Sequence, residues 1–366
     1  MLITTSKDNL NTAINAVQRA INAKSIIPSY SCIKLEVKGN TAVFTGAGLD
    51  VSIECTIPVQ TDREGVALIP AKAFSDIVRR LPDLPITLEH SDSMEMSIRY
   101  ERANFTLSTI ASDDFPLMDI VQGSLVFSIA ADPLKKLVRQ STFASSNDEL
   151  KGVFTGILWE LEAGDLSLIG TDTHRLAWTK APVNQSEDLS SGSFIIPAKT
   201  TTEIARLLQN EDCQVKADQN IVSFTFDNIR IQCRVMEGSF PNYRQVIPER
   251  FVTSIQAESK TIRDAAERIS LFAVMTELSS TIYLEIEDSA LSVHSRSDIG
   301  FGREEIPVRQ EGDDLHIAFN SRYITDFFKV AEEERVIIQL SGQLSAGIMK
   351  EESDDSFLYL VLPIKA

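Results

Sequence analysis

Asp172, His174 and Arg175 bring a carboxylate, an imidazole and a guanidinium together within four positions of the segment GTDTHRLAW. Such a trio could support hydrolysis if a nucleophile with an oxyanion hole, or a metal ion, stood beside it. The chain contains no G-x-S-x-G or Walker-type loop that would supply the nucleophile or hold a phosphate. A hydrolase that uses Asp172 and His174 is therefore one hypothesis, and a binding site at the same residues is the other.

The histidines give no support to a metal site. They lie far apart in the chain, and neither the H-x-x-x-H nor the H-E-x-x-H spacing occurs. The four cysteines form no C-x-x-C pair, and each lies in or near an apolar stretch, which predicts buried free thiols in a reducing compartment. They are Cys32, Cys55, Cys213 and Cys233. We therefore expect neither a metal nor a cofactor.

The elements that must position these residues belong to an internal repeat. The segments LIPAKAFSDIVRRL, FIIPAKTTTEIARLL and AFNSRYITDFFKVA share one pattern, in which Lys72, Lys199 and Arg322 correspond at intervals of 127 and 123 residues. Three other segments, each with a proline at its end, recur at intervals of 124 and 125 residues. Their prolines are Pro58, Pro182 and Pro307. The period is too long for a solenoid and normal for a domain.

The repeat divides the chain into three domains of one fold, with boundaries at 1–120, 121–248 and 249–366. Each begins with a short strand and a helix, for example a helix with Leu10, Ile14, Val17 and Ile21 on one face. Alternating strands follow, with turns expected at Gly39-Asn40, Gly164-Asp165 and Asp288-Ser289. A second helix comes next, and strands that we expect to begin at MEMSIRY, IVSFTFD and VIIQLSG close each unit. Two helices against antiparallel sheet are an α+β layering.

Composition and charge limit the function classes. With 43% hydrophobic and 24% charged residues, the chain fits a globular protein. Its start, MLITTSKDNL, has no export signal and no apolar run reaches membrane-spanning length, so we expect a cytoplasmic protein without a membrane partner. The net charge of −17 would argue against nucleic acid if it were spread evenly.

The charge is not spread evenly. Six helical windows carry sixteen basic and seven acidic residues, a net charge of +9 that leaves −26 on the rest of the chain. The windows are 7–24, 72–80, 132–139, 199–206, 260–268 and 322–329. Basic residues on solvated helix faces would explain this excess without any ligand. The alternative is that the helices share a surface that binds phosphates without reading bases.

The motifs TDTHRLA, GSFPNYRQVIP, the IPAK helices and the terminal LVLPIKA, in this order, resemble the bacterial DNA sliding clamp, the β subunit of DNA polymerase III. The resemblance covers the whole chain. It implies three DNA-clamp domains that form a ring as a head-to-tail homodimer, with helices lining the hole and sheets outside. It also implies a processivity factor without a catalytic site, which encircles double-stranded DNA without sequence specificity and tethers the polymerase.

The resemblance implies three sets of site residues. A peptide-binding pocket between the second and third domains would contain Phe154, Thr171, Thr173, His174, Arg175, Leu176, Pro241, Val246, Leu360, Leu362, Pro363 and Ile364. The residues expected to face DNA are Lys24, Lys72, Arg79, Lys136, Lys151, Lys199, Arg206 and Arg322. The dimer interface would join Phe105 and Leu107 to the partner's Leu271 and Phe272. From the residues alone, all four would be assigned to the core of the chain, because Leu271 and Phe272 end a helical stripe.

Peptides of the polymerase III catalytic subunit, the clamp loader, repair polymerases, mismatch repair proteins and ligase are the partners that the resemblance implies. Apolar and proline walls would receive leucine or phenylalanine side chains, and His174 and Arg175 would hold polar backbone groups. Gln245, Thr173 and Phe154 depart from the residues common in relatives and would change which peptides bind best. A third hypothesis, an acidic repeat scaffold that binds only proteins, predicts helix lysines scattered around the outside.

Overall fold

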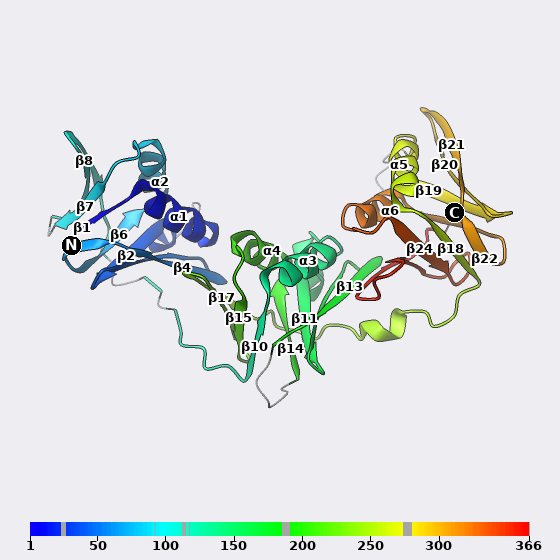
Figure 1. Ribbon diagram of the computed structural model, residues 1–366, viewed down its shortest axis with the longest axis horizontal. Helices are drawn as coiled ribbons and strands as arrows, with labels where there is room; N and C mark the ends of the chain where they lie inside the picture. The colour runs from blue at the N-terminus through cyan, green and yellow to red at the C-terminus, as the bar shows by residue number, and fades with distance from the viewer. Residues whose placement is uncertain are drawn as a thin grey trace. The chain divides into compact units, whose positions relative to one another are not determined.

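The structure is a computed structural model that describes residues 1–22, 27–91, 93–111, 115–116, 118–184, 191–273 and 280–365. One order of elements occurs three times along the chain (Figure 1). A strand and a helix are followed by three strands, a further strand and a second helix, and then by three closing strands. The first and third repeats each add one short strand, β5 or β22, after the first three. This repetition confirms the predicted α+β units.

The bounds of the elements in the first repeat are β1 (Leu2–Thr5), α1 (Lys7–Val17), η1 (Gln18–Ala20), η2 (Pro28–Ser31), β2 (Cys32–Lys38), β3 (Thr41–Ala47), β4 (Val51–Pro58), β5 (Gln60–Arg63), β6 (Gly65–Pro70), α2 (Ala71–Arg80), β7 (Ile86–Ser91), β8 (Glu95–Tyr100) and β9 (Ala103–Ser108). In the second repeat they are β10 (Leu125–Ile129), α3 (Ala131–Thr142), η3 (Glu149–Thr155), β11 (Gly156–Glu162), β12 (Asp165–Thr171), β13 (Arg175–Pro182), β14 (Gly192–Pro197), α4 (Ala198–Leu207), β15 (Cys213–Ala217), β16 (Ile221–Phe226), β17 (Ile229–Arg234) and η4 (Tyr243–Val246). In the third they are β18 (Thr253–Glu258), α5 (Ser259–Ser270), β19 (Thr281–Glu287), β20 (Ala290–Ser297), β21 (Gly300–Pro307), β22 (Arg309–Gly312), β23 (Leu315–Asn320), α6 (Ser321–Phe328), β24 (Arg335–Leu340), β25 (Gly347–Glu351) and β26 (Phe357–Val361).

The sheets cross the repeat boundaries. An eight-stranded antiparallel sheet, β10-β15-β16-β17-β4-β3-β2-β6, joins strands of the first and second repeats through β4 and β17. A nine-stranded sheet, β14-β11-β12-β13-β26-β25-β24-β18-β22, joins the second and third repeats through β13 and β26. The remaining strands form the sheets β5-β1-β7-β8-β9 and β21-β20-β19-β23. The sequence did not reveal that neighbouring repeats are joined by continuous sheets.

The chain forms two compact units, which we describe separately. One comprises Met1–Ala131, Asn184–Ser190 and Glu203–Val235, and the other Asp132–Val183, Ser191–Thr202 and Met236–Ala366. The eight-stranded sheet lies in the first unit and the nine-stranded sheet in the second. The compact units therefore differ from the three repeats, because each shared sheet holds parts of two repeats together.

Apolar periodicity explains the helices. In α1, Ser6 caps the first turn by accepting a hydrogen bond from the backbone N–H of Asn9 at 3.2 Å. Leu10, Ile14 and Val17 are buried as predicted, whereas the α-helix ends at Val17 and Ile21 has extended backbone. α1 packs beside α2, and α5 beside α6 (Figure 1). The second helices bury an apolar stripe against their sheets, for example Phe74 and Val78 of α2.

Two sequence-based expectations were wrong in detail. The turn predicted at Gly164-Asp165 lies one residue earlier, at Ala163 and Gly164, which have φ of 53° and 86°. The closing strands begin at β7 and β15 rather than at MEMSIRY and IVSFTFD. The strands β7 and β15 were missed because they are short and partly polar, so their two-residue alternation is weak. The four cysteines are buried and free, as predicted.

Candidate functional site

A tight turn connects β12 to β13 and contains Asp172, Thr173 and His174. One carboxylate oxygen of Asp172 accepts hydrogen bonds from the backbone N–H groups of His174 at 2.9 Å and Arg175 at 3.0 Å. The Thr171 hydroxyl donates to the Arg175 carbonyl at 2.6 Å. Thr173 has a φ of 83°, an uncommon conformation for a β-branched residue. The Asp172 carboxylate thus holds the turn.

Arg175 is buried, with 7% of its surface exposed, and its guanidinium is bound on several sides. Nε donates to the other oxygen of Asp172 at 3.1 Å, Nη1 to Asp326 at 2.7 Å and Nη2 to the carbonyl of Phe143 at 2.7 Å. The ring of Tyr323 lies 4.5 Å from the guanidinium carbon. These contacts tie β13 to α6, so Arg175 joins the second and third repeats instead of pointing toward a ligand.

The charges of Arg175 and Asp326 stabilise each other. Burial alone would lower the pKa of Arg175, but the hydrogen bond to Asp326 and the charge of Asp172 raise it above its ordinary value. Burial alone would raise the pKa of Asp326, but hydrogen bonds from Lys329 and Arg175 lower it. Both groups therefore remain charged at neutral pH.

Leu176 and Leu360 face each other across the pairing of β13 with β26 and form the centre of an apolar cluster. The buried members of the cluster are Leu158, Ile169, Leu176, Ile195, Tyr243, Ala346 and Leu360. Val153, Trp178, Met236, Phe240, Ile247 and Leu358 pack against it while partly buried. The sequence predicted Leu176 and Leu360, and it missed Val153, Phe240, Tyr243 and Ile247. The spacing of apolar residues in KGVF and GSFPNYRQVI could have indicated them.

The other predicted pocket residues occupy the rim. Val246 and Leu362 are exposed hydrophobic residues, and Pro241, Thr173 and His174 are exposed as well. The backbone N–H of Leu362 donates to the His174 carbonyl at 2.9 Å, which connects the C-terminal segment to the turn. Pro363 and Ile364 are partly buried, and the N–H of Ile364 donates to the carbonyl of Ala318 at 2.8 Å.

Phe154 is displaced from the centre. Its ring lies 6.5 Å from that of Phe240, whereas Val153 packs against the cluster itself. Exposed apolar side chains beside a partly buried apolar cluster are typical of a docking site for hydrophobic side chains of a partner.

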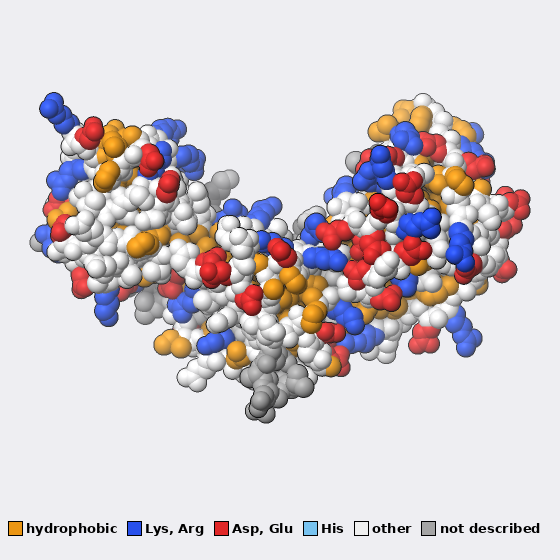
Figure 2. All heavy atoms as spheres, viewed as in Figure 1, with side chains coloured by type: hydrophobic (Ala, Val, Ile, Leu, Met, Phe, Trp, Pro, Cys, Tyr) orange, Lys and Arg blue, Asp and Glu red, His pale blue; other side chains and the backbone are white. Residues whose placement is uncertain are grey.

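The predicted DNA-facing residues that the structure describes fall into two groups. Lys72, Lys199 and Arg322 are each the second residue of their helix, and all three are exposed, as are Arg79 and Arg206. On the face shown in Figure 2, basic and acidic side chains are interspersed over the region of α5 and α6. Lys24 lies outside the described residues.

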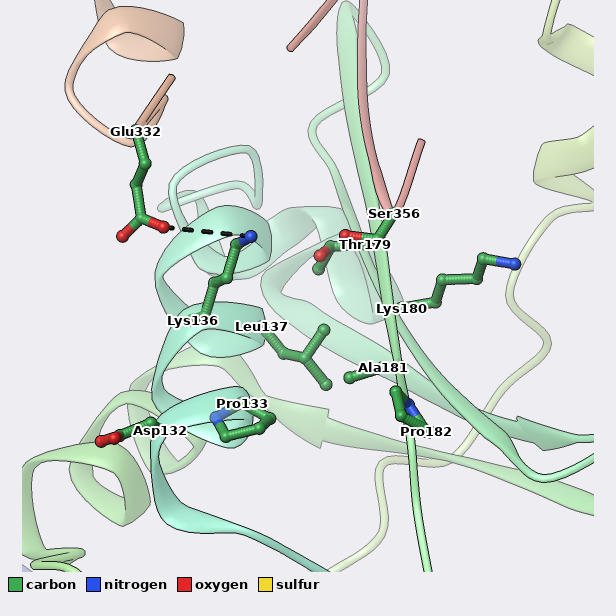
Figure 3. Close-up of a pocket in the computed structure, with 10 residues that line it drawn as sticks. All are labelled: Asp132, Pro133, Lys136, Leu137, Thr179, Lys180, Ala181, Pro182, Glu332 and Ser356. Carbon is green, nitrogen blue, oxygen red and sulfur yellow. Dashed lines mark ion pairs between the residues drawn. The ribbon is translucent and has the colours of Figure 1, made fainter. Parts of the chain in front are cut away.

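Lys136 and Lys151 are engaged within the chain. The Lys151 ammonium donates to the carbonyl of Asp172 at 3.0 Å. Lys136 lies 2.8 Å from Asp354 and 3.9 Å from Glu332. Lys136 lines a pocket of about 420 Å³. Figure 3 shows it on α3 beside Leu137, with the residues at the end of β13 on the other side. Burial opposes its charge, but the carboxylates raise the pKa of Lys136 above its ordinary value. The ammonium groups of both lysines are therefore bound within the chain and are not free on an open surface.

The predicted interface residues are not in the core. Phe105 is 39% exposed on β9, and Leu271 is 74% exposed just after α5. Leu107 is partly exposed on the same face of β9. The ring of Phe272 lies over Gly300 and Gly302 of β21, where a Cβ atom on Gly302 would come within 2.6 Å of the ring. The helical stripe of α5 thus ends at Ile269, after which Leu271 is exposed and Phe272 is partly buried.

None of the helices in the described ranges is both long and apolar enough to cross a membrane. Within the same part of the chain, no three His, Cys, Asp or Glu side chains are grouped so that they could hold a metal ion.

Known proteins resemble this chain over its full length. Residues 1–119, 128–242 and 244–365 match the N-terminal, central and C-terminal domains of the DNA polymerase III beta subunit. Beta sliding clamps of Staphylococcus aureus and Staphylococcus epidermidis are each 30% identical to this chain, and the alignments cover 100% of this chain and 99% of each clamp. The solved DNA polymerase sliding clamp of Bacillus subtilis has a TM-score of 0.96 at 28% identity, covering 100% of this chain and 99% of that one. A sliding clamp from Pseudomonas aeruginosa bound to griselimycin has a TM-score of 0.95 at 27% identity, with both chains fully covered. The chain therefore belongs to the family of DNA polymerase III beta subunits, the bacterial sliding clamps.

Proposed function

We propose that two copies of the chain join head to tail into a ring around duplex DNA, and that partner proteins dock at the apolar cluster around Leu176 and Leu360. As a member of its family, the chain is a DNA sliding clamp, a processivity factor that acts in DNA replication. It is a non-catalytic subunit whose partners in general are DNA, the polymerase and other clamp-binding proteins. The finer statements below are our own.

The two joints within the chain suggest how a second copy binds. In each, the third residue of a closing strand pairs with the residue five positions before the proline that ends the opposite strand. Ile231 of β17 pairs with Ile53 of β4, and Tyr359 of β26 pairs with Ala177 of β13. The first repeat contributes a closing strand, β9, and the third contributes a strand ending in proline, β21. Among the described residues neither strand has the corresponding neighbour, since each lies at the edge of its sheet.

Applying the same register to these edges pairs Phe105, the third residue of β9, with the partner's Gly302. The partner's Phe272, which lies over Gly302 within its own chain, would then pack against Phe105. Ile231 and Tyr359, which occupy the position of Phe105 at the internal joints, are almost completely buried. The exposed Phe105 supports an intermolecular joint at which it becomes buried in the same way.

The acidic residue of each second helix supports the same assignment. Glu203 of α4 forms an ion pair with Arg19 of the first repeat, and Asp326 of α6 forms one with Arg175 of the second. Each of these acidic residues therefore binds a cation of the preceding repeat. Asp76 of α2 is the equivalent residue, and its side chain is 47% exposed in a repeat that has no predecessor in the chain. A partner's third domain would supply the missing neighbour.

Duplex DNA would be bound without sequence readout by the cations of the second helices. Lys72, Lys199 and Arg322 repeat at one helical position, and Arg79 and Arg206 repeat near the helix ends. Contacts to phosphates carry no sequence information and exchange readily, which permits sliding. We also propose Lys24, Lys136 and Lys151 as secondary contacts to DNA. Lys136 would first have to leave its carboxylate partners, and Lys151 its carbonyl partner.

Short peptides of the polymerase III catalytic subunit, the clamp loader, repair polymerases, mismatch repair proteins and ligase are the proposed ligands of the apolar cluster. The exposed rim of Pro241, Val246 and Leu362 beside buried Leu176 and Leu360 supports this assignment. Thr171, Thr173, His174, Pro363, Ile364 and Phe154 complete it. Arg175 contributes by fixing the turn, because its own donors are bound internally. We further propose domain boundaries at 1–120, 121–248 and 249–366, and a cytoplasmic location.

The observation that carries the proposal is the unpaired edge of β9 with exposed Phe105. The test is retention on DNA. After loading by a clamp loader, the chain should remain on a nicked circular duplex through a salt wash and leave once the circle is linearised. A particle mass of one chain, or equal retention on linear and circular DNA, would contradict the proposal. Absence of retention on either DNA would instead favour a scaffold that binds proteins alone.

A further inference from the structure

The wall segment, residues 236–248, runs along the apolar cluster without being part of any sheet. It lies between the end of β17 at Arg234 and the start of β18 at Thr253. Its backbone is attached to the sheet through the N–H of Met236, which donates to the carbonyl of Ile195 at 2.9 Å. Since regular backbone pairing does not hold the rest of this segment, side-chain contacts must determine where it lies.

The wall segment forms one side of the proposed docking site. Tyr243 is a buried member of the apolar cluster, and Phe240 and Ile247 pack against it. Pro241 and Val246, between them, are exposed on the rim. A change of about 1 Å in the position of this segment would therefore alter the width of the site.

A close approach between Gly238 and Val153 restricts the start of the segment. Gly238 has a φ of 126°, which favours glycine, and a Cβ atom there would come within 2.7 Å of a methyl group of Val153. The far end, from Tyr243 to Val246, forms a single short 3-10 turn. Something else must hold this turn against the sheet.

Glu160 of β11 supplies that attachment. The Tyr243 hydroxyl donates to one Glu160 oxygen at 2.6 Å, and Arg244 donates to both oxygens at 3.1 and 2.7 Å. The Arg244 guanidinium also lies 4.8 Å from the centre of the Tyr243 ring and binds Glu162 at 2.8 Å. One carboxylate thus binds two consecutive residues of the wall segment, in the bidentate geometry that gives the strongest charge-assisted hydrogen bonds.

Burial makes this contact necessary. The Tyr243 side chain is inside the cluster, and a buried hydroxyl without a partner is costly. Burial and the neighbouring Glu160 raise the pKa of Tyr243, so that the phenol keeps its proton and remains a donor at neutral pH. Without the Glu160 carboxylate, the hydroxyl would have to move toward water and carry the segment with it.

We propose that Glu160 is a positioning residue for peptide docking: by binding Tyr243 and Arg244 it holds the wall segment at the distance that admits leucine and phenylalanine side chains. This inference rests on the proposed docking site. Glu160 itself lies beneath the wall segment, and its effect on a peptide is exerted through Phe240, Val246 and Ile247.

The experiment measures the affinity of the full-length protein for a fluorescein-labelled synthetic peptide with a leucine and a phenylalanine near its C-terminus. Glu160→Ala should weaken binding about tenfold, as expected for loss of a charged hydrogen-bonding group. Glu160→Gln, which keeps one acceptor, should recover most of the affinity. Tyr243→Phe, which keeps the ring and loses the donor, should weaken binding by a smaller factor. Glu162→Gln is the matched control, since Glu162 lies on the same strand and binds Arg244, and it should stay within twofold of the parent.

Hydrogen exchange provides the second measurement. Glu160→Ala should accelerate amide exchange within residues 236–248 and leave β19 and β20 unchanged, and the particle mass and the retention on circular DNA should also be unchanged. Unaltered peptide affinity for Glu160→Ala, when Leu362→Asp abolishes binding, would overturn the positioning role while leaving the docking site intact. Undiminished binding by Leu362→Asp would instead refute the docking site. Accelerated exchange throughout the protein without recovery by Glu160→Gln would assign Glu160 a general structural role and overturn the inference.

Discussion

The guanidinium of Arg175 and the carboxylate of Asp326 form a buried ion pair, with Nη1 2.7 Å from Oδ2, although 151 positions separate the two residues in the chain. Each partner has further contacts, to Asp172 on one side and to Lys329 on the other. The pair therefore links the turn beside the proposed docking site to α6, the helix that also carries the exposed Arg322.

Replacing Arg175 with methionine should destabilise the joint between the second and third repeats. The change leaves Asp326 and Asp172 buried with fewer donors, which for a buried pair costs about 3–5 kcal/mol. The measurement is the free energy of unfolding at pH 7, with hydrogen exchange across β13 and β26. Lys180→Met is the control, because Lys180 lies on the same strand with a more exposed side chain. An effect no larger than that of the control would show that the pair contributes little.

Acid should weaken the same joint. The pKa of Asp326 lies below its ordinary value of 3.8, because hydrogen bonds from Lys329 and Arg175 outweigh the opposing effect of burial. A depressed folded pKa means that the stabilisation is fully present above about pH 4 and is lost as the pH falls through the folded value. The difference in unfolding free energy between the parent and Asp326→Asn should therefore narrow below pH 4. A difference that stays constant from pH 7 to pH 3 would contradict this.

Arginine at position 105 should leave the chain monomeric. The proposed interface buries Phe105 against the partner's Phe272, and an arginine placed there would have to lose its hydration. Analytical ultracentrifugation at micromolar concentration should give the mass of one chain, with unchanged circular dichroism. Ile120→Arg is a suitable control, because Ile120 is 86% exposed outside the proposed interface. Dimers formed by Phe105→Arg would place the interface elsewhere.

Glutamate at positions 72, 199 and 322 together should weaken binding to a short linear duplex and flatten its salt dependence. Each lost phosphate contact reduces the slope of log affinity against log salt by about 0.9. The control variant carries glutamate at positions 38, 216 and 309, which changes the net charge equally at exposed residues of strands. Equal losses in both variants would mean that net charge alone matters, and that the helices have no special role.

Glycine at position 173 should stabilise the protein by up to about 1 kcal/mol. Thr173 has a φ of 83°, which a β-branched residue adopts at a cost and glycine adopts freely. Thr173→Ala should fall between the two residues in the midpoint of thermal unfolding. A lower midpoint for glycine would indicate that contacts of the threonine side chain outweigh the backbone strain.

The repeat was the part of the fold that the sequence predicted best. Corresponding lysines, acidic residues and prolines recur at one period, and the elements follow that period in all three copies. The joining of repeats was not predictable in this way, because a strand that pairs with the next repeat has the same alternation as a strand that pairs within its own. Only the three-dimensional register reveals that β4 pairs with β17.

The candidate site shows the same division. Leu176 and Leu360 were predicted, and they meet across the sheet. Arg175 was expected to face a peptide, yet it is buried. The sequence could not predict this, because neither the neighbours of Arg175 nor its charge indicate that Asp326 lies beside it. Val153 was overlooked in favour of Phe154, since the two adjacent apolar residues cannot be told apart until the 3-10 turn orients them.

The continuous sheets within the chain have a mechanical consequence. At both internal joints, a full antiparallel ladder and buried side chains resist separation, and the covalent chain keeps the halves at high effective concentration. At the proposed contact between β9 and β21, the ladder and the packing of Phe105 would hold two molecules together without that covalent tether. The proposed ring would open with least work at its two intermolecular contacts, and these would then be the places where DNA enters.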